Sequence, residues 1–425
     1  MTSAHLRCSN PTCGAEQPRD LQVYACPACQ GLLEFTYDFP LAEAPEWPQL
    51  WQRRLGHGGD LDGSGVWRFR ELLPLFDGLT PVVSLGEGCT PLIAAPRAAR
   101  WADVETFFVK HQGVNPTGSF KDLGMTVCVT EALRRDVGIV ACASTGNTSS
   151  SMAAYAARAG LRSLVFVPRG AVSGAKLAQA IDFGAQVVET GENFDQAFRL
   201  LRQMAGELGL YLVNSINPFR LEGQKTVVLE LLAQRQWQPP DYIVLPGGNL
   251  GNVSAVGKCL AELASLNLLE RMPRLVVVQA AGASPFHQMQ LSHSPQLTPV
   301  AEPTTRATAI RIGNPANWPR AVRALELTEG LTESVTDEEI RAAKAELARA
   351  GIGCEPASAA TLAGVRKLRL GGAIEEGAEV VAILTGHQLK DPDYIMEQVQ
   401  SRGGSGVLSL DPDPEAIRRA LRNWL

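Results

Sequence analysis

Short runs of apolar residues alternate along this chain with longer segments whose apolar residues recur every three or four positions. The apolar runs predict buried strands at Phe107–Lys110, Ile139–Ala143, Leu164–Val167, Val187–Glu189, Tyr242–Leu245, Leu275–Gln279 and Val380–Leu384. Segments with helical spacing between them include Met152–Ala159, Ala175–Phe183 and Phe194–Leu208. Parallel strands that are covered on both faces are apolar throughout, so this alternation predicts an α/β fold with largely parallel sheets.

Three segments fall outside the alternation. Residues 1–38 hold clustered cysteines and show little helical periodicity, and residues 39–80 are rich in Trp, Pro and Gly. We interpret the second segment as a linker that packs on the main body and ends in a helix near Arg68–Phe76. Residues 281–318 are polar, and a connection of this length predicts a loop near the active site.

Composition narrows the class of protein. A chain of 425 residues predicts two or three domains. The net charge of -5 gives no electrostatic reason to expect nucleic acid or an anionic membrane as partner. The N-terminus lacks the apolar stretch of a secretory signal, and the longest apolar runs are too short to cross a bilayer. We therefore expect a cytoplasmic protein.

Four of the nine cysteines have the spacing of a metal site, Cys8-x4-Cys13-x12-Cys26-x2-Cys29. Two such pairs on short turns place four thiolates around one tetrahedral ion, and zinc suits four sulfurs. The alternative is four unrelated reduced cysteines. The other five cysteines lie singly in the sequence, so their distribution indicates no disulfide framework. Only Arg7 and Arg19 bring positive charge to this segment, which favours a structural role over nucleic-acid binding.

The segment Asn115-Pro-Thr-Gly-Ser-Phe-Lys121-Asp122 lies between a predicted strand and a helix expected from about Asp122 to Arg135. An ammonium group near the positive end of a helix is shifted toward its neutral form. A neutral amine can attack an aldehyde, so Lys121 is a candidate for a Schiff base. Taken alone, an exposed lysine without a role is the simpler interpretation.

Two further loops each follow a strand and open a helix. Ala143-Ser-Thr-Gly-Asn-Thr-Ser-Ser150 offers hydroxyls and backbone N–H groups to an anion such as a carboxylate. Leu245-Pro-Gly-Gly-Asn-Leu-Gly-Asn252 lets the backbone approach a phosphate closely. It lacks the Lys-Ser/Thr ending of a Walker loop and the dinucleotide spacing, so it suits a single phosphate monoester. An ordinary helix cap and a plain glycine-rich turn are the alternatives.

With these loops the chain resembles the threonine synthases, which are fold-type II pyridoxal-phosphate enzymes. The resemblance runs from about Leu85 to Asp391 and rests on Leu85–Leu92, Asn115–Asp122, Ser144–Ser149, Asn214–Lys225, Gly248–Asn252, Ile312–Pro315 and Thr385–Asp391. It implies a two-domain α/β enzyme of the tryptophan synthase β-like type, with an N-terminal zinc-ribbon-like segment at 1–38. The large domain is expected at 39–129 and 216–425, the small one at 130–215, and a homodimer is the family expectation.

The resemblance also implies residue roles. Lys121 would hold pyridoxal 5'-phosphate as a Schiff base, and Asn147 and Thr385 would contact its phenolic oxygen and ring nitrogen. The cofactor phosphate would be held by Gly248, Asn249, Leu250, Gly251 and Asn252. Substrate would be bound by Ser144, Thr145, Thr148, Asn214, Ser215 and Arg220. One departure is Cys89, where the family usually has Asn, which puts any polar contact from this position in doubt.

The function expected from the resemblance is conversion of O-phosphohomoserine and water to threonine and phosphate. One alternative is another enzyme of the same fold, either a threonine or serine dehydratase or a cysteate synthase-like enzyme acting on O-phosphoserine. A second is a non-catalytic binding protein that keeps the fold and uses the zinc ribbon as an interaction module. The presence together of Lys121, Asn147, the phosphate loop and Thr385 argues against the second.

Overall fold

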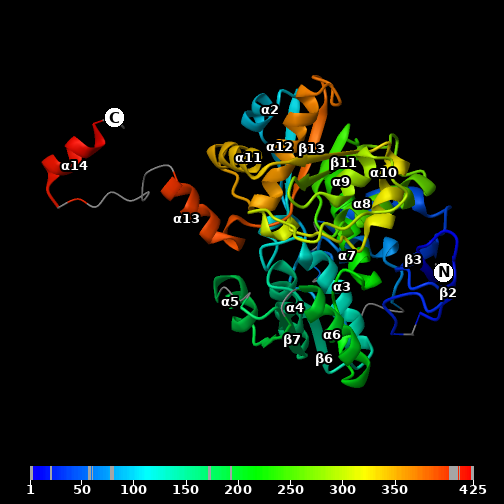
Figure 1. The fold of residues 1–425 in the computed structure, drawn as a ribbon. Helices are drawn as coiled ribbons and strands as arrows, with labels where there is room; N and C mark the ends of the chain where they lie inside the picture. Colours follow the sequence, from blue (N-terminus) through cyan, green and yellow to red (C-terminus); the bar gives the residue numbers. More distant parts are fainter. Residues whose placement is uncertain are drawn as a thin grey trace. The chain divides into compact units, whose positions relative to one another are not determined.

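The computed structural model describes residues 3–19, 22–55, 59, 61–76, 81–170, 174–191, 194–401, 410 and 412–422. They form two units, Met1–Lys390 and Asp391–Leu425. The second unit holds helices α13 (Pro392–Ser401) and α14 (Pro414–Leu421). All other elements belong to the first unit, whose ribbon is drawn in Figure 1.

The larger sheet of the first unit has six strands in the order β12-β11-β10-β13-β5-β4. They span Leu331–Val335, Arg274–Ala280, Tyr242–Pro246, Glu379–Leu384, Thr106–His111 and Leu92–Ala94, in that order. Neighbouring strands pair in parallel except for β4, which runs antiparallel to β5. The carboxyl ends of five strands therefore lie at one edge, where ligands of α/β sheets bind.

Side chains of the central strands alternate between two cores. In β10, Ile243 and Leu245 join the core beneath helices α7, α8 and α10, whereas Tyr242 and Val244 join the core beneath α2, α11 and α12. Every one of these four side chains is buried. Because both faces are covered, the strand needs apolar residues at every position, which is why it appears in the sequence as an unbroken apolar run.

The helices of the two faces are separate sets. On one side lie α7 (Pro218–Gln234), α8 (Gly251–Ser265) and α10 (Trp318–Thr328), together with α3 (Lys121–Arg134). On the other lie α2 (Pro96–Ala102), α11 (Asp337–Arg349) and α12 (Pro356–Leu370). The short α9 (Pro285–Leu291) follows β11.

The smaller sheet has four parallel strands in the order β8-β7-β6-β9. They span Gln186–Glu189, Arg162–Val167, Ile139–Ala143 and Tyr211–Leu212. Helices α4 (Asn147–Ala159), α5 (Gly174–Asp182) and α6 (Phe194–Glu207) lie with this sheet in one lobe of the ribbon (Figure 1). The domain boundaries at 129/130 and 215/216 remain a prediction.

The N-terminal segment forms a three-stranded antiparallel sheet, β2-β1-β3. Its strands are Glu16–Gln17, Ser3–Cys8 and Leu33–Asp38. The ring of Phe35 in β3 meets Phe219 in α7 edge-to-face, with centroids 4.8 Å apart. The N-terminal sheet is thus packed on α7, a helix of the large lobe, which is the part of the first unit built on the six-stranded sheet.

The segment after it packs as expected but does not end in the helix predicted near Arg68–Phe76. Helix α1 (Trp47–Arg54) buries Trp47 and Trp51, and a 3-10 helix spans Trp67–Leu72. Pro74 removes a backbone donor two residues later, which is why the turn does not continue into an α-helix.

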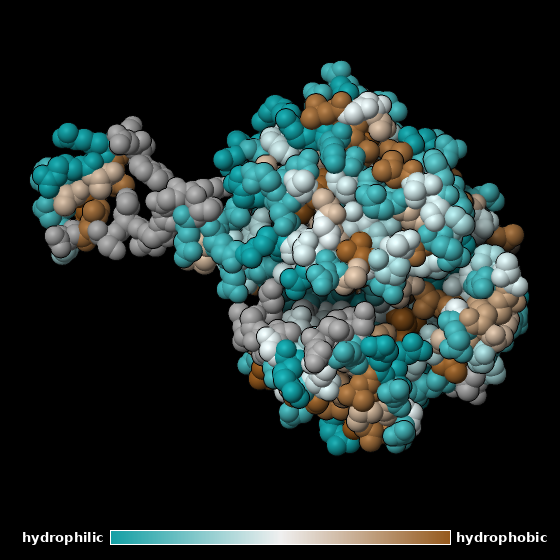
Figure 2. Space-filling model, viewed as in Figure 1, coloured by the Kyte–Doolittle hydropathy of each residue, from teal (hydrophilic) through white to brown (hydrophobic). Residues whose placement is uncertain are grey.

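The seven predicted strands are all confirmed, and so are the helices expected within α3, α4, α5 and α6. Three further strands of these two sheets, β4, β9 and β12, were not predicted, and the polar segment 281–318 contains α9 as well as loop. No helix in the described residues is long and apolar enough to cross a membrane. On the face drawn in Figure 2, apolar side chains occur in small groups scattered among polar ones.

Candidate active site

Lys121 is the first residue of α3, at the end of the turn that follows β5. This turn is fastened to the end of β13: the Phe120 N–H donates to the Thr385 carbonyl at 2.9 Å, and Ser119 forms an isolated bridge with Gly386. The pairing of β5 with β13 places these two carboxyl ends side by side. Lys121 and Thr385, far apart in sequence, are therefore neighbours.

The amine of Lys121 is unusually acidic for a lysine. Burial lowers its pKa to about 7, and the nearby Arg220 guanidinium acts in the same direction, whereas Glu355 acts against it. Removing a charged ammonium from water favours its neutral form. A large share of Lys121 is thus a free amine near neutral pH, as nucleophilic addition to an aldehyde requires.

Asn147 and Thr385 both donate hydrogen bonds to the carboxylate of Glu355. The Asn147 side-chain amide donates to Glu355 Oε2 at 3.0 Å, and the Thr385 hydroxyl donates to Glu355 Oε1 at 3.0 Å. Thr385 is also held by Ser358, whose hydroxyl accepts a 2.8 Å hydrogen bond from its backbone N–H. Burial raises the pKa of Glu355, while its bonds to Asn147 and Thr385 favour the carboxylate. No motif in the sequence singled out Glu355.

The loop Ser144–Gly146 joins β6 to α4, and Thr148 lies in the first turn of α4. Ser144, Thr145 and Thr148 are all half-buried. No side chain caps α4, whose N-cap is Gly146. The backbone N–H groups of the first turn of a helix have no partner within the helix, so this turn can receive an anion.

The glycine-rich loop Gly247–Leu250 joins β10 to α8. Leu250 has a left-handed backbone (φ 62°), and no side chain caps the helix that follows it. A Cβ on Gly248 would lie 3.1 Å from the Ala309 carbonyl oxygen, so the loop passes close to the segment before α10. Gly251 and Asn252 open α8, which leaves their N–H groups for a ligand. The polar segment 281–318 does reach this loop, as its predicted place near the active site requires.

The other three residues that the resemblance assigns to the substrate, Asn214, Ser215 and Arg220, have different surroundings from one another. The side-chain amide of Asn214 pairs with both backbone groups of Ala143, at 3.1 and 2.9 Å. The Ser215 hydroxyl accepts a 2.5 Å hydrogen bond from Asn249 of the glycine-rich loop. Asn214 thus fixes the end of β6, and Ser215 contacts the glycine-rich loop.

Arg220 is a buried cation without a carboxylate partner. Its side chain is 2% exposed, and its Nη1 donates to the Val213 carbonyl at 3.0 Å. In the described part of the chain its Nε has no hydrogen-bond partner, and no Asp or Glu forms an ion pair with it. A buried guanidinium normally pairs with an acid, so this one is free to receive an anion.

A small cavity lies between the turn before α3, the end of β13 and the start of α8. Phe120, Thr385 and Asn252 line it together with Gln112, Gln224 and apolar side chains. The structure therefore brings together the surroundings of Lys121, the end of β13 and the start of α8.

The four N-terminal cysteines converge, with all Sγ atoms within 4.8 Å of one another. The Sγ atoms of Cys8 and Cys29 are 3.4 Å apart, and those of Cys13 and Cys26 are 3.8 Å apart. A tetrahedron with Zn–S bonds of about 2.3 Å has sulfurs about 3.8 Å apart, so the cluster fits zinc.

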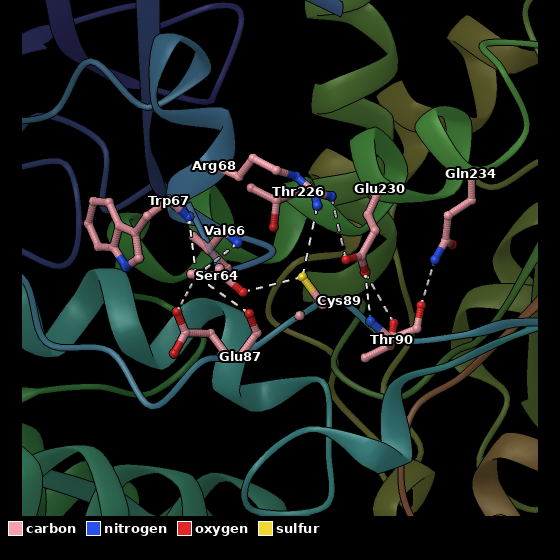
Figure 3. A network of polar contacts seen from close by, with 12 residues as sticks. Ser64, Val66, Trp67, Arg68, Glu87, Cys89, Thr90, Thr226, Glu230 and Gln234 are labelled. Carbon is pink, nitrogen blue, oxygen red and sulfur yellow. Dashed lines mark hydrogen bonds and ion pairs between the residues drawn. The ribbon is translucent and has the colours of Figure 1, made fainter. Parts of the chain in front are cut away.

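Cys89, the departure from the family pattern, has a left-handed backbone with φ 50°. Figure 3 shows it between Arg68 and the Ser64 turn; its thiol donates to the Gly63 carbonyl at 3.3 Å. Burial raises the pKa of this thiol, so it stays protonated. Asn tolerates this backbone better than other side chains, which gives a conformational reason for the usual residue.

The next residue, Thr90, belongs to a buried polar network beside Cys89 (Figure 3). Its N–H and hydroxyl both donate to Glu230 at 3.2 Å, and the Lys110 ammonium lies 2.6 Å from the same carboxylate. The network fixes the loop before β4 and is structural.

Comparison with known proteins agrees with this geometry. Residues 83–386 match the family of pyridoxal-phosphate dependent enzymes. A threonine synthase of Methanosarcina acetivorans is 43% identical over 418 residues, 98% of each chain. One from Mycobacterium leprae is 47% identical over 78% of this chain and 90% of its own. The structure of threonine synthase from Escherichia coli superimposes with a TM-score of 0.71 over 100% of both chains at 20% identity, a likeness of fold.

The chain belongs to the pyridoxal-phosphate dependent enzymes of fold type II. The identity of 43% over nearly the whole length places it, within that family, among the threonine synthases. The predicted fold class is thereby confirmed, whereas the roles of individual residues remain proposals.

Proposed function

We propose that this enzyme converts O-phosphohomoserine and water to threonine and phosphate, with pyridoxal 5'-phosphate bound by Lys121. Bound there, the cofactor supplies an electron sink for carbanions next to its imine. Asn147 and Thr385 would contact its phenolic oxygen and ring nitrogen. Gly248, Asn249, Leu250, Gly251 and Asn252 would hold its phosphate at the start of α8.

The observation that carries this proposal is the buried, acid-free guanidinium of Arg220 beside Lys121. A planar guanidinium can donate to two phosphate oxygens at once. Dehydratases act on substrates without phosphate and have no use for such a cation. We therefore assign Arg220 to the substrate phosphate, with Ser215 beside the phosphate loop and Ser144, Thr145 and Thr148 at the substrate carboxylate. Asn214 supports this site by fixing the end of β6.

Lys121 would also carry protons. With substrate bound, the Lys121 amine would be free, and a pKa of about 7 would let it accept a proton and return it at neutral pH. We assign it successive transfers at the α-, β- and γ-carbons. The hydroxyl of Thr385 cannot supply the negative charge of a carboxylate, so the ring nitrogen would stay largely unprotonated.

The N-terminal cluster of Cys8, Cys13, Cys26 and Cys29 would bind one structural zinc ion. The four sulfurs would complete its coordination and leave no open position for catalysis. We further propose a cytoplasmic homodimer that binds neither nucleic acid nor membrane.

The deciding experiment measures threonine and inorganic phosphate released from O-phosphohomoserine, with O-phosphoserine and threonine as competing substrates. Equal yields of both products from O-phosphohomoserine are expected. Lys121→Ala should lose the visible absorbance that borohydride removes from the wild type. If that absorbance persists in the variant, or if only the competing substrates react, the proposal fails.

A further inference from the structure

The N-terminal sheet touches the large lobe through a buried arginine of α10. The Arg320 side chain is only 2% exposed, and its Nη2 donates to the Leu33 carbonyl at the start of β3. Its Nε lies 3.7 Å from the Glu34 carboxylate. Leu33 follows Cys29 by four residues, so Arg320 forms its hydrogen bond with the strand that comes directly after the cysteine cluster.

The same guanidinium reaches toward the phosphate loop. Its Nη1 donates to Asn317 Oδ1 at 2.8 Å, and the Asn317 side-chain N–H group donates to the Asn249 carbonyl at 3.2 Å. Asn317 is fully buried, and the neighbouring Ala316 N–H donates to Asn249 Oδ1 at 2.6 Å. A continuous hydrogen-bonded path therefore runs from β3 through the buried Arg320 and Asn317 to the half-buried Asn249 of the glycine-rich loop.

The direction of each bond in this path is set by the arginine. A guanidinium has only donors, so it must face the oxygen of the Asn317 amide, and this turns the amide nitrogen toward Asn249. The carbonyl of Asn249 and the N–H of Leu250 belong to one planar peptide group and point in opposite directions. Holding that carbonyl therefore fixes the direction of a loop N–H that would face a phosphate.

We propose that Arg320 is a positioning residue through which the docked N-terminal sheet orients the phosphate loop, so that affinity for a phosphate depends on that docking. The inference rests on the proposed role of residues 248–252. It gives the N-terminal segment a part in cofactor retention as well as in structure.

The chain offers a matched control one turn further along α10. Arg323 pairs with the same Glu34 carboxylate, at 2.7 and 2.8 Å, and is 40% exposed. It holds the same strand without bonding to Asn317. A variant of Arg323 therefore removes a surface ion pair to the same strand while the buried bond from Arg320 to Leu33 still holds the sheet in place.

The experiment titrates cofactor-free protein with pyridoxal 5'-phosphate and with pyridoxal, following the visible absorbance of each adduct. Arg320→Leu should raise the Kd for the phosphorylated compound on the order of 10- to 100-fold, because a hydrogen-bonded donor to the phosphate is misdirected. Its Kd for pyridoxal should stay within about twofold, since no phosphate is involved, and Arg323→Leu should leave both constants within about twofold. A general loss of folding would lower the affinity for both compounds alike.

Unchanged affinity for pyridoxal 5'-phosphate in Arg320→Leu, or equal losses for both compounds, overturns the inference. If this variant does not fold, Arg320→Lys takes its place, since one ammonium cannot span the positions of two guanidinium nitrogens. Removing metal from the wild type with a chelator should reproduce the phosphate-selective loss, and unchanged affinity there also counts against the inference. If the wild type itself forms no adduct at Lys121, it is the proposed function that fails.

Discussion

The side-chain amide of Asn147, at the start of α4, donates a 3.0 Å hydrogen bond to the carboxylate of Glu355, at the start of α12. Helix α4 lies with the smaller sheet and α12 packs on the larger one, so this hydrogen bond joins the small lobe to the large lobe across the proposed cofactor site. Glu355 also accepts from Thr385, and a Cβ on Gly386 would lie 2.5 Å from its carboxyl carbon. One carboxylate thus sets the orientation of both groups that would contact the cofactor ring.

Replacing this carboxylate should impair catalysis while leaving the fold intact. We expect Glu355→Gln to lower kcat/KM on the order of 10- to 100-fold, because glutamine keeps only one of the two acceptor oxygens that Asn147 and Thr385 use. The visible spectrum of the bound cofactor should change in the same variant. Glu376→Gln, at a surface glutamate 82% exposed, is the control and should match the wild type. An unaltered spectrum and rate in Glu355→Gln would remove Glu355 from the site.

The pH dependence of cofactor addition should report the acidity of Lys121. Burial lowers the pKa of its amine to about 7, so the neutral, reactive fraction grows as pH rises through 7 and is nearly complete by pH 8. Stopped-flow absorbance of cofactor-free protein mixed with pyridoxal at different pH values measures this. A midpoint near 7 is expected, and one above 9 would contradict the burial of the amine.

Replacing Arg220 should impair substrate binding without lowering the stability of the fold. A buried cation without an acidic partner costs folding free energy, so Arg220→Leu should leave the cofactor-free protein as stable as the wild type or about 1–3 kcal/mol more stable. The same change should raise the KM for O-phosphohomoserine on the order of 100-fold, since the charge-assisted phosphate contact is lost. Urea unfolding and steady-state kinetics measure the two effects. A variant that is less stable but keeps its KM would show that Arg220 serves the fold.

The left-handed backbone of Cys89 predicts a stabilising substitution. Asn is among the few side chains that tolerate φ near 50°, so Cys89→Asn should raise the free energy of unfolding by about 0.5–1 kcal/mol. Cys89→Ala, which has no such tolerance, should not do so. Chemical denaturation of the three proteins distinguishes the backbone effect from loss of the thiol contact with Gly63.

The sequence predicted strands wherever both faces are covered, as in β10 and β13, because burial on both sides leaves an apolar run. It did not predict β12, Leu331–Val335, an edge strand whose Thr332, Glu333 and Ser334 are only half-buried. An edge strand meets solvent on one side, so its composition resembles that of a loop.

The candidate site could also be predicted only in part from the sequence. Loops with glycines and hydroxyls are conspicuous directly after a strand, so Lys121 and the glycine-rich loop could be proposed from the sequence. Glu355 carries a weak signal, a lone glutamate before Pro356 at a helix start, and its importance comes from the folding of α12 against α4. Arg320 reads as an ordinary helical cation until its partners, nearly 290 positions away in sequence, are seen beside it.

The contacts of β3 have a consequence for the order in which the protein matures on the ribosome. Cys8, Cys13, Cys26 and Cys29 are synthesised together, so their cluster can close within the first thirty residues. The surfaces that receive β3, Phe219 and Arg320, emerge only after about half and three quarters of the chain have been made. The N-terminal segment can therefore fold before the surface on which it docks has been made. A newly made chain reaches its full affinity for a phosphate only when that late docking is complete.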